Sequence, residues 1–300
     1  MKSTSLQKPF LKWVGGKTQI IEVVSSKFPK EINNYHEPFL GGGSVLFALL
    51  SLIRENHIVL KGKIYCYDLN EALINVYKHI QNEKDTLMNY VEYYMNQYDE
   101  LSGTIVYRKP QNIDEAKTSK ESFYYWMRHL YNTIEHDTIE RSALFMCINK
   151  TCFRGMYREG PNGFNIPYGH YKKTPKIMTR DELDNISNMI KDVVFQCCDF
   201  ESAINNVEKD DFIYIDPPYA PENRTSFVGY LVDGFSYDDH QRLFSCIKNM
   251  DKSIKFVMSN AKVDLVLNAF EEYHYETIVA RRAINAKNPN SVTNEVIVYN

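Results

Sequence analysis

The sequence predicts an α/β fold with a doubly wound, mostly parallel sheet. Short apolar runs typical of buried strands recur along the chain. The first two are followed by helical patterns, and polar or glycine residues stand where the strands would end. Alternation of strands and helices is typical of parallel sheets. The predicted strands are NNYHEPF (33–39), KIYCYD (63–68), DFIYID (211–216) and KSIKFVMSN (252–260).

Two glycine-containing segments open the chain. FLKWVGGK (10–17) lets the backbone wrap a ligand while Lys17 meets a carboxylate or a phosphate, although the spacing is not that of a P-loop. EPFLGGGS (37–44) predicts a turn and a helix that starts near Ser44, with its N–H groups aimed at a ligand. Taken alone, such a turn also serves simple packing.

The second strand ends at Asp68, which follows Gly43 by 25 residues (68 − 43). In nucleotide-binding α/β folds an acid about 20 residues past the glycines accepts the ribose hydroxyls. A helix N-cap is the alternative role. The glycine turn and this acid together indicate a nucleoside-containing ligand without a diphosphate. The pattern after Asp68 predicts a helix with apolar positions 69, 73, 76, 77 and 80.

The middle of the chain, 82–185, predicts a helical insertion between two halves of the α/β domain, 1–81 and 186–300. YVEYYMNQYDEL (90–101) and ESFYYWMRHLYNTI (121–134) are aromatic-rich helical patterns. A long loop (149–175) follows them.

Later in the chain, capping boxes predict helix starts at Thr179 and Ser236. YETIVARRAI (275–284) and NEVIVYN (294–300) predict a terminal hairpin around a polar connection.

Charge and composition narrow the class of protein. Residues 141–180 carry eight Lys or Arg against one acid, and 181–215 carry nine acids against two lysines, which predicts a basic face beside an acidic segment. The six cysteines lack metal-ligand spacing, so we expect reduced, mostly buried thiols and no structural metal. The absence of a signal pattern predicts an intracellular protein, and FLGGGSVLFALLSLI (39–53) is short for a membrane span.

The stretch FIYIDPPYAP (212–221) indicates the chemistry. Two prolines stiffen the turn after the strand, so that Asp216, the Pro217 carbonyl and the Tyr219 ring form a fixed cluster. An exocyclic amine of a nucleobase is a poor nucleophile, because its lone pair is delocalised into the ring. Two acceptors that bind its two protons favour a pyramidal nitrogen, and a stacked aromatic ring sets its direction of attack on an electrophilic methyl group.

These motifs occur in the order FLKWVGGK, EPFLGGGS, YDLN, the insertion and DPPYAP. In that order the chain resembles the Dam-type (D12 class, alpha group) DNA adenine-N6 methyltransferases, from about Phe10 to the terminal strands. The resemblance implies a seven-stranded S-adenosylmethionine-binding sheet with an inserted helical DNA-recognition domain. It also implies double-stranded DNA as substrate, with the target adenine flipped out because its amine is unreachable inside a duplex.

The resemblance also implies roles for individual residues. Asp216, Pro217 and Tyr219 are expected to hold the target adenine. The residues expected to bind S-adenosylmethionine are Trp13, Lys17, Phe39, Gly41, Gly43, Asp68, Asp199, Phe200 and Asp216. The residues expected to contact DNA are Lys12, Arg154, Met156, Arg158, Pro167, Tyr171, Lys172 and Lys173.

One position departs from the family. GATC-specific members have YNG where this chain has FRG, with Arg154 in place of Asn. Arg pairs with the two acceptors of guanine, whereas Asn pairs with adenine. The resemblance therefore does not extend to GATC as the recognition sequence.

Alternatives remain at this stage. Cytosine N4, RNA or a protein glutamine are other amine substrates, and a catalytically inactive DNA-binding protein is a reading from another class. The Asp before the prolines and the early cofactor motif favour the adenine enzymes. Two contexts stay open: a restriction–modification system, whose restriction endonuclease would act on the same site without direct contact, and an orphan Dam-like enzyme.

Overall fold

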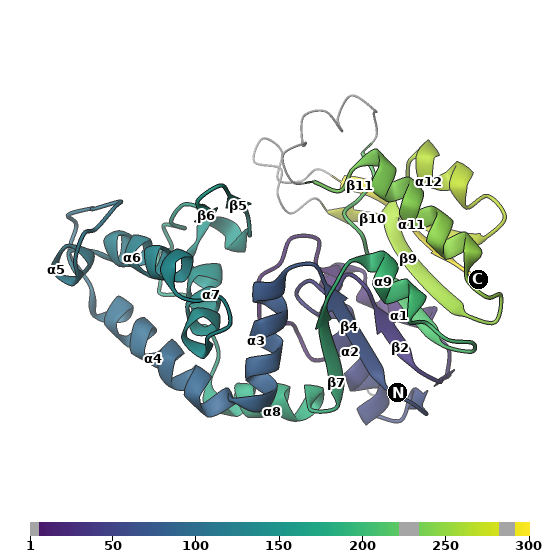
Figure 1. The fold of residues 1–300 in the computed structure, drawn as a ribbon, viewed down its shortest axis with the longest axis horizontal. Helices are drawn as coiled ribbons and strands as arrows, with labels where there is room; N and C mark the ends of the chain where they lie inside the picture. The colour runs from purple at the N-terminus through teal and green to yellow at the C-terminus, as the bar shows by residue number, and fades with distance from the viewer. Residues whose placement is uncertain (1–5, 222–233, 282–291) are drawn as a thin grey trace. The chain divides into compact units, whose positions relative to one another are not determined.

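The computed structural model describes residues 6–221, 234–281 and 292–300, and the chain divides into two compact units (Figure 1). We call 1–8, 17–69 and 192–300 the sheet unit, and 9–16 and 70–191 the helical unit. The expected insertion, 82–185, falls within the helical unit, which also includes 9–16, 70–81 and 186–191.

The sheet unit contains a seven-stranded sheet with the order β10-β11-β9-β8-β2-β4-β7. The five strands from β9 to β7 are mutually parallel, and β11 runs antiparallel to both of its neighbours. The predicted mostly parallel, seven-stranded α/β fold is therefore confirmed. The strands are β2 (Tyr35–Glu37), β4 (Ile64–Asp68), β7 (Val193–Cys197), β8 (Phe212–Ile215), β9 (Lys255–Ala261), β10 (His274–Arg281) and β11 (Val292–Tyr299).

Both faces of the sheet are covered, as the alternating side chains of β8 show. Ile213 and Ile215 join a core cluster with apolar residues of α9, α11 and α12. Phe212 and Tyr214 face the other way, where the ring of Phe28 lies 4.9 Å and 6.3 Å from theirs. A strand buried on both faces reads as a continuous apolar run, which explains the composition of FIYI.

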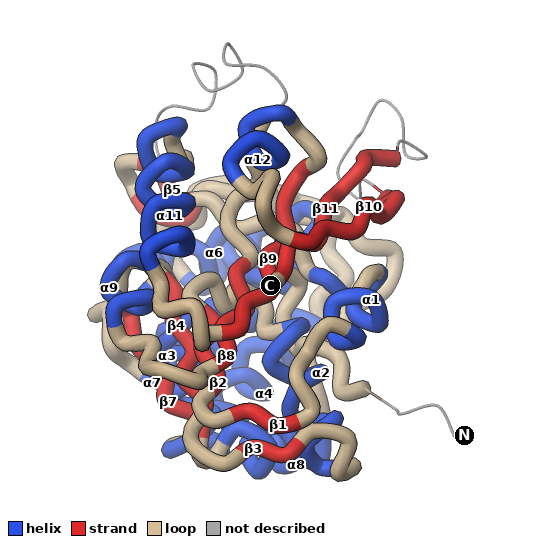
Figure 2. Tube along the Cα trace, turned by 90° about the vertical axis from the view of Figure 1, so that its right-hand side faces the viewer, coloured by secondary structure: helices blue, strands red, loops and turns tan. Residues whose placement is uncertain are grey.

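The predicted helix starts in the sheet unit follow local rules. α2 begins at Ser44, as expected, after Gly43 in the left-handed conformation with φ of 71°. The capping box at Ser236 and Asp239 begins α11 as predicted. The short strands β1 and β3 pair in parallel apart from the main sheet (Figure 2). The remaining elements are η1 (Lys17–Gln19), α1 (Ile21–Ser26), β1 (Glu31–Ile32), α2 (Ser44–Arg54), β3 (Val59–Leu60), α9 (Phe200–Asn205), α11 (Tyr237–Asn249) and α12 (Asp264–Ala269).

The predicted terminal strands are present as β10 and β11, which pair from His274 with Tyr299 to Arg281 with Val292. The polar connection between them, 282–291, lies outside the described residues.

The helical unit is built around α7, whose side chains are buried on nearly all its faces. It packs against α3, α4 and α6, which explains why its sequence lacks a clear polar stripe. The capping box at Thr179 begins α8 as predicted. The elements are α3 (Glu71–Asn82), α4 (Lys84–Glu100), α5 (Ile113–Ala116), α6 (Lys120–Thr133), α7 (Ile139–Thr151), η2 (Phe153–Gly155), β5 (Glu159–Gly160), β6 (Gly163–Phe164) and α8 (Arg180–Ile190).

The expected apolar face of the helix after Asp68 was wrong at one position. The side chain of Asn70 accepts a hydrogen bond from Leu73 N at 3.0 Å and begins α3 at Glu71. Leu69 therefore precedes the helix and is 73% exposed.

The six cysteines are all free thiols, but only Cys66, Cys147 and Cys152 are buried. The expectation of mostly buried thiols thus holds for half of them. None of the helices in the described parts of the chain is both long enough and apolar enough to span a membrane.

Candidate active site

Three acids meet at one edge of the sheet. Because β8, β2 and β4 are adjacent and parallel, their carboxyl ends lie together. Glu37 ends β2, Asp68 ends β4, and Asp216 follows β8. Ligands of open α/β sheets bind in the crevice outside such strand ends. This edge is therefore the candidate active site.

Lys17 joins the two predicted catalytic side chains. Its Nζ lies 2.7 Å from Asp216 Oδ2, and the side chains are 6% and 18% exposed. The same ammonium lies 4.8 Å from the centre of the Tyr219 ring. The sequence left open whether Lys17 meets a carboxylate or a phosphate, and in this structure it meets the protein's own carboxylate.

The second oxygen of Asp216 is available to a ligand. Asp216 Oδ1 is buried and has no hydrogen-bond partner among the residues that the structure describes. Burial raises the pKa of Asp216 to about 6, although the positive charge of Lys17 opposes the rise. A buried acceptor without a partner is costly, so this atom calls for an N–H or O–H donor that the described residues do not supply.

Glu37 lies deeper at the same edge. It is 2% exposed and accepts a hydrogen bond from Tyr35 Oη at 2.8 Å. Burial raises its pKa well above the usual range, and the nearby charges of Asp216 and Asp68 raise it further. The site thus combines a deeply buried carboxyl, whose pKa is raised, with the less buried carboxyl of Asp216.

The glycine turn after β2 is fastened to the end of β4. Gly41 N donates to Asp68 Oδ2 at 2.9 Å, and Leu40 N donates to Tyr67 O at 2.9 Å. Gly41 and Gly43 have φ of 51° and 71°, in the left-handed region that glycine adopts without steric cost, so glycine is favoured there. Asp68 is therefore part of the turn as well as a candidate ligand for ribose hydroxyls.

Asp199 and Phe200, two of the residues expected to bind S-adenosylmethionine, lie at the start of α9. The Asp199 carboxylate caps the helix at Glu201 N and also pairs with Arg242 at 3.0 Å. Phe200 is 4% exposed, with its ring stacked on Phe39 at 5.7 Å. The structure thus brings the predicted residues Phe39, Asp199 and Phe200 into one cluster.

Two residues that the sequence did not single out support the loop after β8. Asn260, at the end of β9, accepts hydrogen bonds from Ala220 N at 3.0 Å and Ala261 N at 2.8 Å. Glu295, on β11, accepts a hydrogen bond from Tyr219 Oη at 2.9 Å. Asn260 follows Ser259 at the end of its strand, and Glu295 follows Thr293 and Asn294 at the start of its strand, so no local sequence signal distinguishes either residue.

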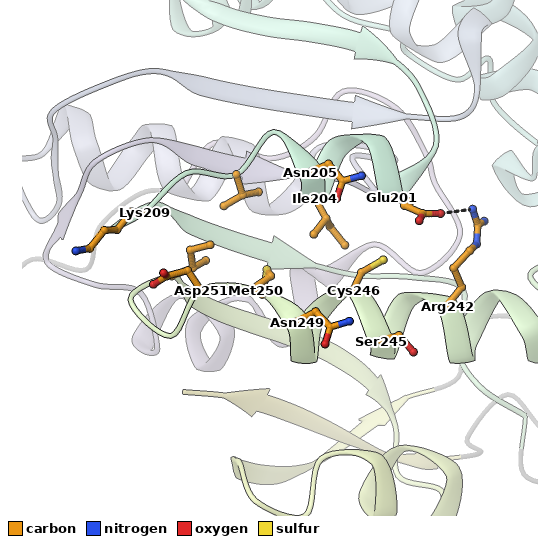
Figure 3. Close-up of a pocket in the computed structure, with 12 residues that line it drawn as sticks. Glu201, Ile204, Asn205, Lys209, Arg242, Ser245, Cys246, Asn249, Met250 and Asp251 are labelled. Atoms are coloured by element: carbon orange, nitrogen blue, oxygen red, sulfur yellow. Dashed lines mark hydrogen bonds and ion pairs between the residues drawn. The ribbon is translucent and has the colours of Figure 1, made fainter.

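A groove of about 700 Å³ lies beside the cluster of Phe39, Asp199 and Phe200, along α9 and α11 (Figure 3). Glu201 and Arg242 face each other at one end, and Lys209 lies toward the other. None of the predicted cofactor or catalytic residues lines the groove. It is therefore separate from the strand-end site.

The eight predicted DNA-contacting residues all lie in the helical unit. Lys12 Nζ donates to Tyr171 Oη at 3.2 Å, and Tyr171 Oη donates to Cys152 O at 2.9 Å. Arg158 Nε donates to Asn165 Oδ1 at 2.7 Å across the β5–β6 hairpin. Phe153 N donates to Pro167 O at 2.8 Å. The structure therefore gathers most of the predicted set on one hydrogen-bonded loop region.

The predicted basic face is smaller than the charge count suggests. Arg141 is 7% exposed. Its guanidinium lies 4.4 Å from the centre of the Tyr131 ring, and its Nε donates a hydrogen bond to Tyr131 O. Arg180 pairs with Glu92. The exposed basic residues of 141–180 besides Arg180 are Arg154, Arg158, Lys172, Lys173 and Lys176.

Arg154 has an unusual backbone. Its φ of 57° and ψ of 13° place it in the left-handed region. Its side chain is exposed, with the guanidinium 5.2 Å from the centre of the Phe153 ring. Non-glycine residues rarely adopt this conformation, and those that do are found most often at functional sites.

Trp13, the remaining predicted cofactor residue, belongs to the helical unit. Its ring stacks on Tyr157 at 5.5 Å and on Phe145 at 6.2 Å.

The parallel sheet and the acids at its strand ends define an α/β protein with a ligand site at the carboxyl edge of its sheet. The family model for D12 class N6 adenine-specific DNA methyltransferases matches residues 13–284. A type II methyltransferase, M.MjaIII of Methanocaldococcus jannaschii, is 38% identical over 93% of both chains. Type II methyltransferase M1.LlaDCHI of Lactococcus lactis subsp. cremoris is 32% identical over 98% of this chain and 95% of its own. A DNA adenine methylase of Haemophilus influenzae is 30% identical over 96% and 91%.

The chain therefore belongs to the D12 class of N6 adenine-specific DNA methyltransferases. The resemblance inferred from the motifs, and the activity it implied, are confirmed. Methyltransferases of this kind use S-adenosylmethionine in general, and their substrate is DNA.

Proposed function

We propose that Asp216, Pro217 and Tyr219 hold the flipped target adenine for attack by its N6. The buried Oδ1 of Asp216, which has no hydrogen-bond partner in the described part of the chain, carries this proposal. Lys17 occupies Oδ2, so Oδ1 is the atom that accepts one N6–H. The Pro217 carbonyl accepts the other, and the Tyr219 ring stacks on the base.

The protein's contribution to the reaction is positioning and charge. The bound cofactor would supply an electrophilic methyl group, with its sulfur keeping the electron pair of the sulfur–methyl bond that breaks. Two acceptors turn the N6 lone pair out of the ring system, which makes the nitrogen a better nucleophile. Once the new carbon–nitrogen bond forms, a proton must leave N6. Asp216 can accept this proton at Oδ1. Its pKa of about 6 then allows the carboxyl to release the proton again near neutral pH.

The sheet edge suits S-adenosylmethionine. An acid beside a glycine turn and an aromatic cluster at α9 are suited to a nucleoside ligand. We assign the ribose hydroxyls to Asp68 and the adenine to Asp199 and Phe200. The methionine end lies beside the turn from Phe39 to Gly43, with Trp13 and Lys17 as further contacts.

We propose that the loop region around η2 and the β5–β6 hairpin reads a short sequence of duplex DNA. Lys12, Arg154, Met156, Arg158 and Pro167 are the candidate readers. We assign Tyr171, Lys172 and Lys173 to further contacts along the DNA.

Two relatives are named type II methyltransferases, which favours a role in a restriction–modification system. The cognate nuclease would act on the same site without touching this chain. Such a role places the protein inside the cell, wherever the host DNA is.

The test is tritium transfer from labelled cofactor to duplex DNA. Asp216→Ala is expected to abolish transfer while the fold and most DNA affinity remain, because non-specific affinity rests on phosphate contacts. Asp238→Ala removes an exposed aspartate of α11 and is the matched control, with near-normal turnover expected. Near-normal turnover of Asp216→Ala would refute the proposed role.

A further inference from the structure

Tyr219 is held at its far end by a strand distant in the sequence. Its hydroxyl donates to Glu295 Oε2 at 2.9 Å, although the two residues are 76 positions apart. A phenol–carboxylate hydrogen bond is charge-assisted and therefore short and directional. Burial raises the pKa of Tyr219 well above its usual range, and the nearby charges of Asp216 and Glu295 raise it further. The hydroxyl therefore remains a donor at neutral pH.

Glu295 is itself held rigidly, because its strand pairs with a neighbouring strand on each side. It lies on β11, between β9 and β10, where it is paired with Ala261 on one side and Ile278 on the other. The backbone next to Tyr219 is also fastened, because Ala220 N donates to the buried Asn260 at 3.0 Å. The ring is thus fixed both at its hydroxyl and at its backbone.

The Lys17 ammonium covers one face of this ring at 4.8 Å from its centre. A base can then stack only on the opposite face. The anchored hydroxyl sets the orientation of that face, since the two side-chain torsions of Tyr219 would otherwise be free to turn the ring.

We infer that Glu295 is a positioning residue that fixes the plane of Tyr219 for stacking on the flipped base. It acts through the tyrosine hydroxyl and does not touch the substrate. The inference rests on the proposed stacking role of Tyr219. Immobilising one side chain costs about 0.5–1.5 kcal/mol on binding, and prior anchoring removes that cost. Loss of the anchor should therefore raise KM for DNA about 2- to 10-fold.

The experiment is a double-mutant cycle of Glu295→Ala and Tyr219→Phe. Two readouts are KM for duplex DNA and the emission of 2-aminopurine at the target position, which stacking quenches. Each single variant should raise KM by a similar factor and brighten the bound 2-aminopurine. The double variant should be no worse than Tyr219→Phe alone, because Glu295 has no hydroxyl left to anchor. Glu295→Gln, which keeps an acceptor, should restore most of the loss.

Glu276→Ala removes a half-exposed carboxylate on the neighbouring strand β10 and is the matched control, with no change in either readout expected. If Glu295→Ala costs as much in the phenylalanine background as in the parent, the inference is overturned. If Glu295→Ala fails to fold, Tyr219→Phe still tests the inference. Unchanged KM and unchanged emission in Tyr219→Phe would also overturn the inference. Tyr219→Ala separates the stacking role of Tyr219 from the positioning role of Glu295, since unchanged emission in that variant would refute the stacking role itself.

Discussion

Replacing Lys17 with methionine tests the electrostatics of the catalytic edge. The substitution keeps an apolar stem of similar length but removes the ammonium 2.7 Å from Asp216 Oδ2. Asp216 accepts the amine well only when ionised. Its pKa of about 6 therefore predicts that the methylation rate falls as the pH drops through that value. Lys17 lowers the pKa of Asp216, so its removal must move this acid limb to higher pH.

The expected displacement follows from the lost hydrogen bond. A charge-assisted hydrogen bond contributes about 1.5–3 kcal/mol, and about 1.4 kcal/mol corresponds to a tenfold change in the ionisation constant. The limb should therefore rise by about 1–2 pH units. At pH 6.5 about three-quarters of Asp216 is ionised in the parent, against roughly a tenth in the variant if its pKa rises to about 7.5.

The assay is single-turnover methyl transfer at saturating cofactor and DNA, measured from about pH 5.5 to 9. Lys27→Met is a matched control, because Lys27 also pairs with a carboxylate at 2.7 Å, Glu276, and also lies 4.8 Å from a tyrosine ring centre. That control should retain the parent profile. An unmoved or lowered limb in Lys17→Met, or an equal displacement in Lys27→Met, would refute the reasoning.

Three further predictions concern the ligands. Asp68→Ala should weaken S-adenosylmethionine binding by about 2–3 kcal/mol, since two hydroxyls lose charge-assisted hydrogen bonds. Unchanged affinity by calorimetry would rule out the ribose assignment. Removing Lys172 and Lys173 together should reduce the slope of log K against log salt by about two units, and an unchanged slope would place the DNA elsewhere. Arg154→Ala should lose about 1–3 kcal/mol of discrimination at one base pair, measured on duplexes with every single-base change in the site. A uniform loss across that panel would indicate a phosphate contact instead, and no loss at all would remove Arg154 from the specificity set.

Much of the fold was predictable because its signals are local. The capping boxes at Thr179 and Ser236 satisfy backbone donors within three residues, so the sequence alone shows them. The meeting of Asp68 and Asp216 follows from the parallel sheet, whose strand ends share one edge. Family membership followed from the order of the motifs.

The supports of the catalytic loop were not predictable from local pattern. The contact between Tyr219 and Glu295 depends on the register of β11 against β9, and a shift by one residue would turn Glu295 to the other face. Arg141 shows a similar limit. Charge counting places it on the surface, but Tyr131 supplies the carbonyl and the ring that let a guanidinium be buried.

The backbone at Arg154 bears on how recognition diverges among relatives. Asn adopts the left-handed conformation more readily than Arg, so the φ of 57° suits the Asn that GATC-specific members carry there. One unchanged loop conformation can therefore present either a side chain suited to adenine or one suited to guanine. Arg154→Asn should relieve backbone strain of order 1 kcal/mol while exchanging the preferred base. If Arg154 reads a base as proposed, a single substitution there would alter target choice without a compensating change in the scaffold, which would make this position a low-barrier route to new specificities.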